Sequence, residues 1–320
     1  MSKHNSFTSN SEGLILKKTA LFAVKLVLFA AVILFLLFQC VMPQYTELYN
    51  AAIIDKYNRL KSIDQPKIIL VGDSNVAFGF DSEMIQNAFN MPVVNFGLHA
   101  SLGQDFHTDM IKAYIKKGDI VILAPAGYNY KIRSFDCVMA WVTIENHFDL
   151  WKGISYQNYP RMLAAFPTYL KRAIGLFITN KGNRVEDSPW GRQDFNIYGD
   201  YSHPRPICRI DGDNYSQYFQ SDTLNEQLRD YWNDYNKYVL SKGATLYMSA
   251  PPILSVTLDV DLDAMQKQLD DELDFPMISN LKDYIYPLED FYDTGFHLND
   301  NGKVLRTQQF IKDLSAVLNK

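Results

Sequence analysis

The chain has 320 residues, of which 47% are hydrophobic and 21% charged, with a formal net charge of -5 and three cysteines. This length and apolar fraction exclude a disordered chain, and three cysteines are too few for a disulfide scaffold or a multi-cysteine zinc module. The acidic balance also argues against nucleic acid as the main partner, because phosphate contacts require clustered Lys and Arg.

The N-terminal part of the chain predicts a membrane anchor. Residues 1–19 form a predicted cytoplasmic tail, and the apolar run at 20–42 follows them. At 1.5 Å per residue this run spans roughly 34 Å, enough for a hydrocarbon core of about 30 Å. Lys25 lies one turn inside the run and can snorkel to the interface. Lys17 and Lys18 favour an N-terminus that stays inside, so the rest of the chain is expected outside the cytoplasm.

A cleaved signal peptide is the alternative for the same segment, because residues 26–38 have the length of its apolar core. Cleavage requires small residues one and three places before the cut, and the segment 38–42 lacks small residues there. Gln39 likewise occupies the position that should be small before a lipidated Cys40. The pattern therefore favours an uncleaved anchor.

Two cysteines lie in the part of the chain expected outside the cytoplasm. Cys137 and Cys208 could pair there, because that compartment is oxidising. The sequence does not give the distance between them. Two unpaired, buried thiols that act as small hydrophobic side chains are the alternative.

The rest of the chain is predicted to be an α/β protein. Residues 43–65 are expected to form a membrane-proximal stalk with a short helix, and residues 66–320 a single domain. Continuous apolar strands between helices of about 10–15 residues indicate a parallel sheet covered on both faces. The predicted strands lie at 67–71, 92–95, 119–123 and 245–249, with a weak one near 277–278, and the predicted helices begin at 81 or 82 and cover about 102–117, 224–242, 262–273 and 299–318.

Hydrophobic periodicity fades between residues 137 and 221. This stretch is rich in aromatic residues, Asn, Pro and Gly, and it contains one predicted helix at about 159–178. We expect it to form an insertion over the carboxyl edge of the sheet. Lids and substrate-selecting elements usually lie at that edge.

Three short segments place reactive residue types at the ends of predicted elements. Ser74 belongs to a Gly-Asp-Ser-Asn turn after the first strand, where a hydroxyl is exposed at the carboxyl edge of a parallel sheet. Gly97 ends the second strand, where it lets a main-chain amide approach a ligand. His297 follows Asp293 just before the last helix, and an imidazole held by a carboxylate is the base that a serine nucleophile needs. Taken singly, such segments are also typical of helix caps, turns and satisfied polar residues.

The three segments together resemble the SGNH (GDSL-type) hydrolase superfamily. The order Ser, then Asp, then His carries the resemblance, with each residue at the end of a strand or the start of a helix. It covers residues 67–130 and 290–310, and the middle of the chain poorly. The resemblance implies a flavodoxin-like three-layer α/β/α sandwich with a central parallel sheet.

The same resemblance implies roles for individual residues. Ser74 corresponds to the nucleophile, and Asp293 and His297 correspond to the pair that activates it. The family commonly separates that Asp and His by three positions, whereas the separation here is four. Asp293 would then approach the ring from a different angle, and Asp290 is a possible substitute.

An oxyanion hole is also implied by the resemblance. Its donors would be the amides of Ser74 and Gly97 and the side chain of Asn129, which belongs to a Gly-Tyr-Asn segment after the third strand. In the family this segment usually continues with Asp, but Tyr130 follows here. That departure puts Asn129 in doubt as a donor.

The segment 75–103 is similar to a bacterial subgroup of membrane-anchored SGNH-like proteins, whose members include proteins that help acylate teichoic acids and exopolysaccharides. The resemblance implies a serine esterase or O-acyltransferase that acts outside the cytoplasm on acyl groups, with acetyl the expected one, of a cell-surface polysaccharide. It also implies a membrane-bound O-acyltransferase as a partner. The alternative is a catalytically inactive scaffold that binds glycan or recruits that acyltransferase.

Two further histidines are candidate partners of Ser74. His99 and His107 both follow the second strand, and surface or helix-face roles are the alternatives for both. A flavodoxin-like cofactor binder is disfavoured, because the sequence has no Gly-rich phosphate loop or dinucleotide fingerprint. No His, Asp or Glu pair has metal-ligand spacing, so the sequence predicts neither a cofactor nor a metal.

Overall fold

The body of the chain is built on a parallel four-stranded sheet with the strand order β2-β1-β3-β4. The structure is a computed structural model that describes residues 6–129, 135–145, 147–184, 190–210, 223–257 and 260–318. Ile68 in β1 pairs with Val93 in β2 and with Ile120 in β3. The strands are β1 Ile68–Val71, β2 Val93–Asn95, β3 Ile120–Leu123 and β4 Thr245–Met248, and a separate two-stranded parallel sheet contains β5 Ile253–Leu254 and β6 Ile285–Tyr286.

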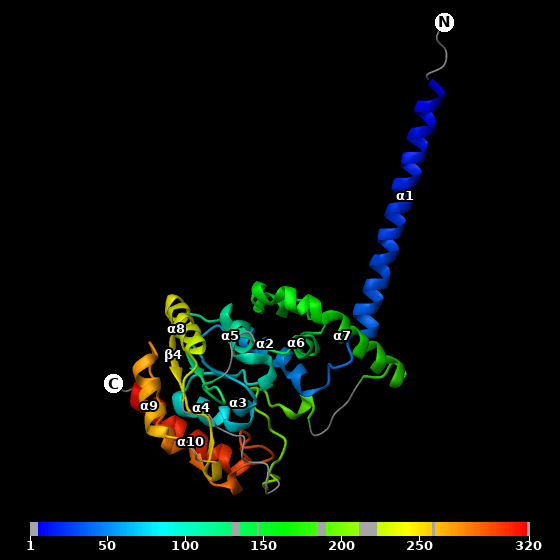
Figure 1. The fold of residues 1–320 in the computed structure, drawn as a ribbon. Helices are drawn as coiled ribbons and strands as arrows, with labels where there is room; N and C mark the ends of the chain where they lie inside the picture. The colour runs from blue at the N-terminus through cyan, green and yellow to red at the C-terminus, as the bar shows by residue number, and fades with distance from the viewer. Residues whose placement is uncertain are drawn as a thin grey trace.

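Helices surround this sheet and one helix extends far from it (Figure 1). The α-helices are α1 Ser6–Leu36, α2 Ala52–Ser62, α3 Ser74–Gly79, α4 Ser82–Phe89, α5 Gly103–Lys112, α6 Cys137–Ile144, α7 Tyr159–Thr179, α8 Glu226–Ser241, α9 Leu262–Glu272 and α10 Asp300–Leu318.

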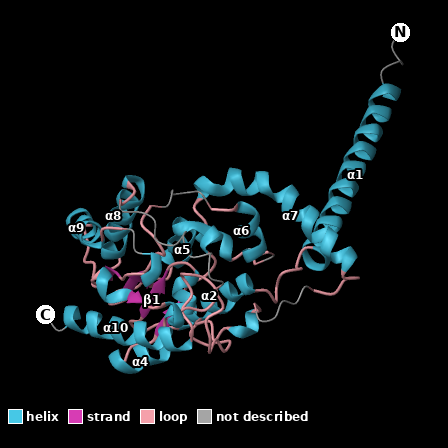
Figure 2. Cartoon of the chain, turned by 60° about the horizontal axis from the view of Figure 1, so that its bottom comes forward, coloured by secondary structure: helices cyan, strands magenta, loops and turns pink. Residues whose placement is uncertain are grey.

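Alternate residues of each strand face opposite sides of the sheet. Ile69 packs in a large cluster with α2, α5 and α8, whereas Ile68 packs in a smaller cluster with α4 and α10. Figure 2 shows α4 and α10 on one side of the strands and α5 and α8 on the other. Strands that are covered on both sides need apolar residues at every position, which explains their continuous Ile, Val and Leu runs. The predicted α/β fold with a central parallel sheet is confirmed.

Most predicted boundaries agree with the structure within one or two residues, with two clear exceptions. The helix predicted to reach residue 117 ends at Lys112. Asp119 explains this early end, because its carboxylate accepts the Lys116 N–H at 2.8 Å and so replaces a helical hydrogen bond. The weak strand predicted near 277–278 is only an isolated bridge between Met248 and Met277.

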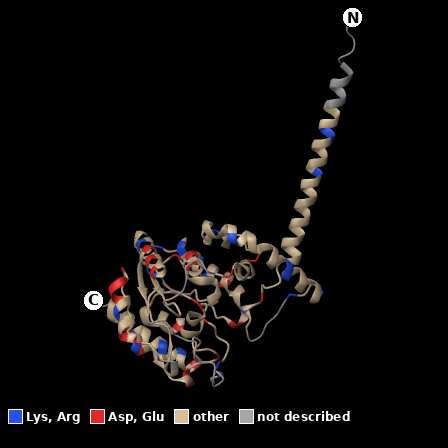
Figure 3. Cartoon of the chain, in the orientation of Figure 1, with Lys and Arg blue, Asp and Glu red and all other residues tan. Residues whose placement is uncertain are grey.

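The N-terminal helix is long and apolar enough to cross a membrane. Residues 13–41 form this candidate span, and none of its most apolar stretch is buried against the rest of the described chain. The helix ends in a π-helical turn at Leu37–Val41. In Figure 3 the part of α1 nearest the body carries no charged residue. Met42 is then fully buried, and its carbonyl accepts the Tyr169 hydroxyl at 3.0 Å, which ties the end of α1 to α7.

Two regions assigned from the sequence have definite places in the fold. Residues 43–65, the expected stalk, contain α2, whose buried side packs in the larger core cluster. The region 137–221 contains α6 and α7, which pack together beside the end of α1 (Figure 1). Cys137 and Cys208 are unpaired and half-buried in the structure.

Candidate active site

Ser74 is the first residue of helix α3, immediately after the carboxyl end of β1. Asp73 caps this helix: its buried carboxylate accepts the Asn75 N–H at 3.0 Å, the Asn75 side-chain amide at 2.7 Å and the Ala126 N–H at 3.1 Å. Burial raises the pKa of Asp73, and the bonds to Asn75 and Ala126 oppose that rise. Gly72 is required before this cap, because an added Cβ would overlap the Ala124 carbonyl. The turn therefore holds the Ser74 side chain in one position.

His297 meets Ser74 across 223 positions of sequence. Its Nε2 lies 2.8 Å from the Ser74 Oγ, and its Nδ1 lies 2.8 Å from Asp293 Oδ1. The four-residue spacing permits this contact because the His297 N–H closes a turn on the Thr294 carbonyl at 3.2 Å. Three residues predicted from the sequence are thus brought together in the order hydroxyl, imidazole, carboxylate.

Asp290, the possible substitute for Asp293, has another role. It is buried, and its Oδ1 accepts the Asn301 side-chain amide at 2.7 Å. Its backbone carbonyl accepts the Asn299 N–H at 2.9 Å. Asp290 therefore supports the start of α10, and Asp293 is the carboxylate that contacts the imidazole.

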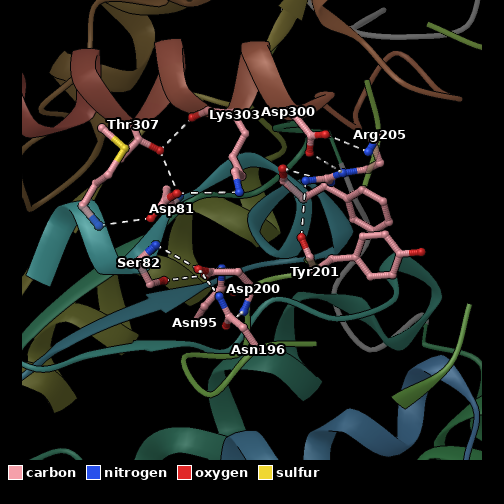
Figure 4. Close-up of polar contacts among 12 residues, drawn as sticks. Asp81, Ser82, Asn95, Asn196, Asp200, Tyr201, Arg205, Asp300, Lys303 and Thr307 are labelled. Carbon is pink, nitrogen blue, oxygen red and sulfur yellow. Dashed lines mark hydrogen bonds and ion pairs between the residues drawn. The ribbon is translucent and has the colours of Figure 1, made fainter. Parts of the chain in front are cut away.

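Aromatic rings hold the imidazole from one side. The Phe78 ring of α3 stacks on the His297 ring with centroids 4.0 Å apart and planes at 10°. The Tyr201 ring stacks on the Phe78 ring, with centroids 4.3 Å apart. The fully buried Arg205 lies over the Phe78 ring and donates to the carbonyls of Phe78 and Tyr201, both at 3.3 Å (Figure 4). These contacts restrict the tilt of the imidazole. Tyr201 and Arg205 lie in the region 137–221, where no sequence motif indicates a site residue.

Gly97 lies close to α3, but its amide is already engaged. The Gly97 N–H donates to Asn95 Oδ1 at 2.9 Å. Asn95 in turn donates from Nδ2 to the Val76 carbonyl at 2.9 Å and to the buried Asp200 at 2.8 Å (Figure 4). A Cβ on Gly97 would clash with the Ala77 N, so the close approach expected of this glycine is present. Its amide would have to leave Asn95 to bind an oxyanion.

Among the described residues, Asn129 makes no hydrogen bond with Ser74. Its side chain is exposed, although the preceding Tyr128 is buried. Tyr130, the residue that departs from the family pattern, lies outside the described residues.

A cavity of about 500 Å³ opens beside the Ser74–His297 pair. Apolar and aromatic side chains dominate its walls, which is typical of ligand-binding cavities. The region 137–221 supplies four lining residues, and the segment that follows α1 supplies four more. The lining residues are Tyr45, Leu48, Tyr49, Asn50, Ser74, Phe78, His99, Ala100, Met139, Val142, Arg172, Trp190 and His297.

The two other histidines differ in position. His99 lines the same cavity as Ser74, and its Nδ1 accepts the Ser101 N–H at 3.1 Å. Burial, with a smaller effect of nearby His297, lowers the pKa of His99. His107 is fully enclosed, and desolvation lowers its pKa to about 3. His99 can therefore offer a neutral ring to a ligand in the cavity, whereas His107 is a core residue.

Within the described residues, no group of three or more His, Cys, Asp or Glu side chains is arranged to hold a metal ion. Comparison with models of known protein families, with curated proteins and with solved structures finds no match to this chain.

Proposed function

We propose that this chain is a membrane-anchored serine esterase or O-acyltransferase of the SGNH type. Its substrates would be acyl groups, with acetyl the expected one, on a cell-surface polysaccharide outside the cytoplasm. One observation carries the proposal: Ser74 Oγ, the His297 ring and Asp293 form a chain of 2.8 Å contacts on the wall of a cavity. This is the arrangement of a serine nucleophile with its general base and orienting carboxylate.

The position in the sheet also supports the proposal. The strand order β2-β1-β3-β4 agrees with the beginning of a flavodoxin-like order, and ligands of such sheets bind at the carboxyl ends of the strands. Ser74 follows the carboxyl end of β1 directly. The resemblance to SGNH hydrolases implies the same placement.

The reaction would proceed through an acyl-enzyme. Ser74 Oγ attacks the acyl carbonyl while its proton passes to His297 Nε2, and Asp293 stabilises the imidazolium through Nδ1. The Ser74 amide, as the first N–H of α3, has no intrahelical acceptor and is a donor for the oxyanion. Collapse of the intermediate breaks the ester bond, and the leaving alkoxide takes the proton from Nε2. Water or a sugar hydroxyl then gives its proton to Nε2 and attacks the acyl-Ser74. Collapse of this second intermediate breaks the bond between the acyl carbon and Ser74 Oγ, and Oγ takes the proton back from Nε2.

The cavity walls are suited to a sugar. Tyr49 and Trp190 offer aromatic faces next to Ser74, and such faces suit the apolar side of a sugar ring. A bound sugar would also exclude water from the acyl-enzyme. The helix α1 would hold the body at the membrane, with Lys17 and Lys18 on the cytoplasmic side.

The second candidate is a catalytically inactive scaffold that binds glycan or recruits a membrane-bound O-acyltransferase. The specific observation that favours it is the oxyanion side of the site. The Gly97 amide is bonded to Asn95, and the exposed Asn129 is absent from the described cavity lining. A protein of this kind would keep the serine and histidine without turning over an ester.

Acetate release from an O-acetylated polysaccharide tests the choice between the two. The full-length chain in nanodiscs is expected to release acetate and to react with a fluorophosphonate probe. Ser74→Ala is expected to lose both activities, and Ser202→Ala, which changes an exposed serine outside the cavity, is expected to keep them. Equal reaction of Ser74→Ala and the unmodified chain would contradict the enzymatic proposal. Cell-surface acylation that survives Ser74→Ala but not deletion of the gene would support the scaffold.

A further inference from the structure

Helix α7 has more apolar surface than its packing uses. Its buried side consists of Met162, Tyr169 and Ala173. The apolar surface continues beyond this side to residues that no part of the described body covers: Leu163 is 65% exposed, Ile174 37% and Ile178 71%. Their spacing of four and eleven positions places them in one row along the helix. A row of large exposed apolar side chains marks an interaction surface.

The charge of α7 is also unlike that of the whole chain. The helix contains Arg161, Lys171 and Arg172 and no Asp or Glu, whereas the chain has a net charge of -5. A helix with an apolar row, a cationic remainder and no acidic residue has the composition of helices that lie on anionic membrane surfaces.

The location of α7 identifies the partner. Figures 1 and 2 both show α7 beside the C-terminal end of α1, where the chain enters the α/β domain. Phe38, in the π-helical turn that ends the long N-terminal helix, stacks on Phe166 of α7 with centroids 6.1 Å apart. The half-exposed Phe148 lies 5.3 Å from the same Phe38 ring. The apolar surface of α7 is thus continuous with the surface of the candidate membrane span.

The distance of Phe38 from Lys18 along the helix places the contact between Phe38 and α7 at the level of the lipid headgroups. Lys17 and Lys18 mark the expected inner boundary of the bilayer. From Lys18 to Phe38 the helix rises roughly 30 Å at 1.5 Å per residue, which is the thickness of the hydrocarbon core. Phe38, and with it α7, therefore lies at the outer boundary between acyl chains and headgroups.

We propose that α7 lies along the membrane surface on the side of the bilayer that faces the body, with Leu163, Ile174 and Ile178 at the boundary of the acyl chains and Lys171 at the lipid phosphates. The proposal rests on the membrane-anchor part of the proposed function and not on catalysis by Ser74. Arg172 of the same helix lines the cavity of Ser74. The cavity is then adjacent to the lipid headgroups, where a substrate attached to a lipid would reach Ser74 without leaving the membrane surface.

Spin-label accessibility in the full-length chain tests this proposal. The three native cysteines are replaced by Ala, and single cysteines are introduced as Ile178→Cys in α7, Val32→Cys in α1 and Leu305→Cys in α10. Leu305 is 40% exposed, and α10 lies on the side of the body away from α1 (Figure 1). Each labelled protein is placed in nanodiscs of phosphatidylcholine and phosphatidylglycerol, and collision with oxygen is compared with collision with a water-soluble nickel chelate.

The label at 178 is expected to have a ratio of oxygen to nickel collision rates several times that at 305. The label at 32, within the membrane span, is expected to have a ratio that also exceeds that at 305. If 32 reports lipid and 178 reports water as 305 does, the inference about α7 is overturned while the anchor stands. If 32 also reports water, the anchor fails and the inference fails with it. Shielding of 178 from both reagents would indicate protein contact, such as a second copy, and would also overturn the inference.

Discussion

The carboxyl ends of β1 and β2 differ in what they offer a substrate. After β1, Ser74 is in contact with His297, and its turn is fixed by the capped helix α3. After β2, the Gly97 amide is held by Asn95 within a buried polar network. The first end is arranged for proton transfer, whereas the second is arranged for structural stability. A site can thus have its nucleophile and base in place while one of its expected oxyanion donors is still engaged elsewhere.

Removal of the His297 imidazole should have the largest effect on activity, because it disables the β1 end of the site. His297→Gln is expected to lower kcat/KM for an ester by at least about 10³-fold, because no other described group is in place to take the Ser74 proton. His203→Gln, which changes a histidine that is paired with Asp194 and does not line the cavity, is the control and should retain most activity. Equal losses in the two variants would mean that the β1 end is not the reacting end.

Asp293→Asn should lower kcat/KM by about 10²- to 10⁴-fold, because an amide no longer fixes the imidazole tautomer or stabilises the imidazolium. Asp290→Asn should instead lower the thermal midpoint, since Asp290 supports the start of α10. Measuring both kcat/KM and Tm for the two variants separates the roles. A greater rate loss in Asp290→Asn would reverse the assignment.

Asp73→Asn tests how much the hydrogen bonds of the Asp73 carboxylate at the β1 end contribute to stability. Asn keeps one acceptor oxygen, so the bonds to Asn75 or to Ala126 are lost, and the free energy of unfolding should fall by about 1–3 kcal/mol. Asp261→Asn is the matched control, because a single oxygen of Asp261 accepts both cap bonds of α9 and Asn caps equally well. Urea unfolding measures both. Equal stability of the two variants would show that the Asp73 network contributes little.

Asn129→Ala should change kcat/KM by less than about twofold, because its exposed side chain does not reach the cavity. Loss of a real oxyanion donor would cost about 10²- to 10³-fold. A loss of that size would mean that the loop after β3 closes on the substrate. The comparison of the β1 and β2 ends would then describe only the ligand-free protein.

The sheet was predictable because β1, β2 and β3 are short runs rich in β-branched residues, because β4 is a short apolar run, and because Gly or Pro follows each strand within a few residues. Helix α3 was not predicted, since its six residues are too few for a periodic pattern and include Gly79. The two-residue strands β5 and β6 are likewise shorter than any run that sequence patterns can detect.

The candidate site was predictable where it lies in short motifs. Ser74 and His297 each lie next to a strand end or helix start, and the resemblance to a known family connects them. Tyr49, Trp190 and Tyr201 gave no such signal, because they come from segments without periodicity and meet only in the folded chain. The occupied Gly97 amide was also beyond sequence reasoning, since its partner depends on one rotamer of Asn95.

Trapping the acyl-enzyme tests the central claim most directly. The full-length chain is mixed with p-nitrophenyl acetate, quenched in acid and digested, and the peptides are analysed by mass spectrometry. The account predicts a single acetyl group on Ser74, which accumulates in the unmodified chain and is absent from His297→Gln. An acetyl group on any other residue, with Ser74 unmodified, would contradict the account.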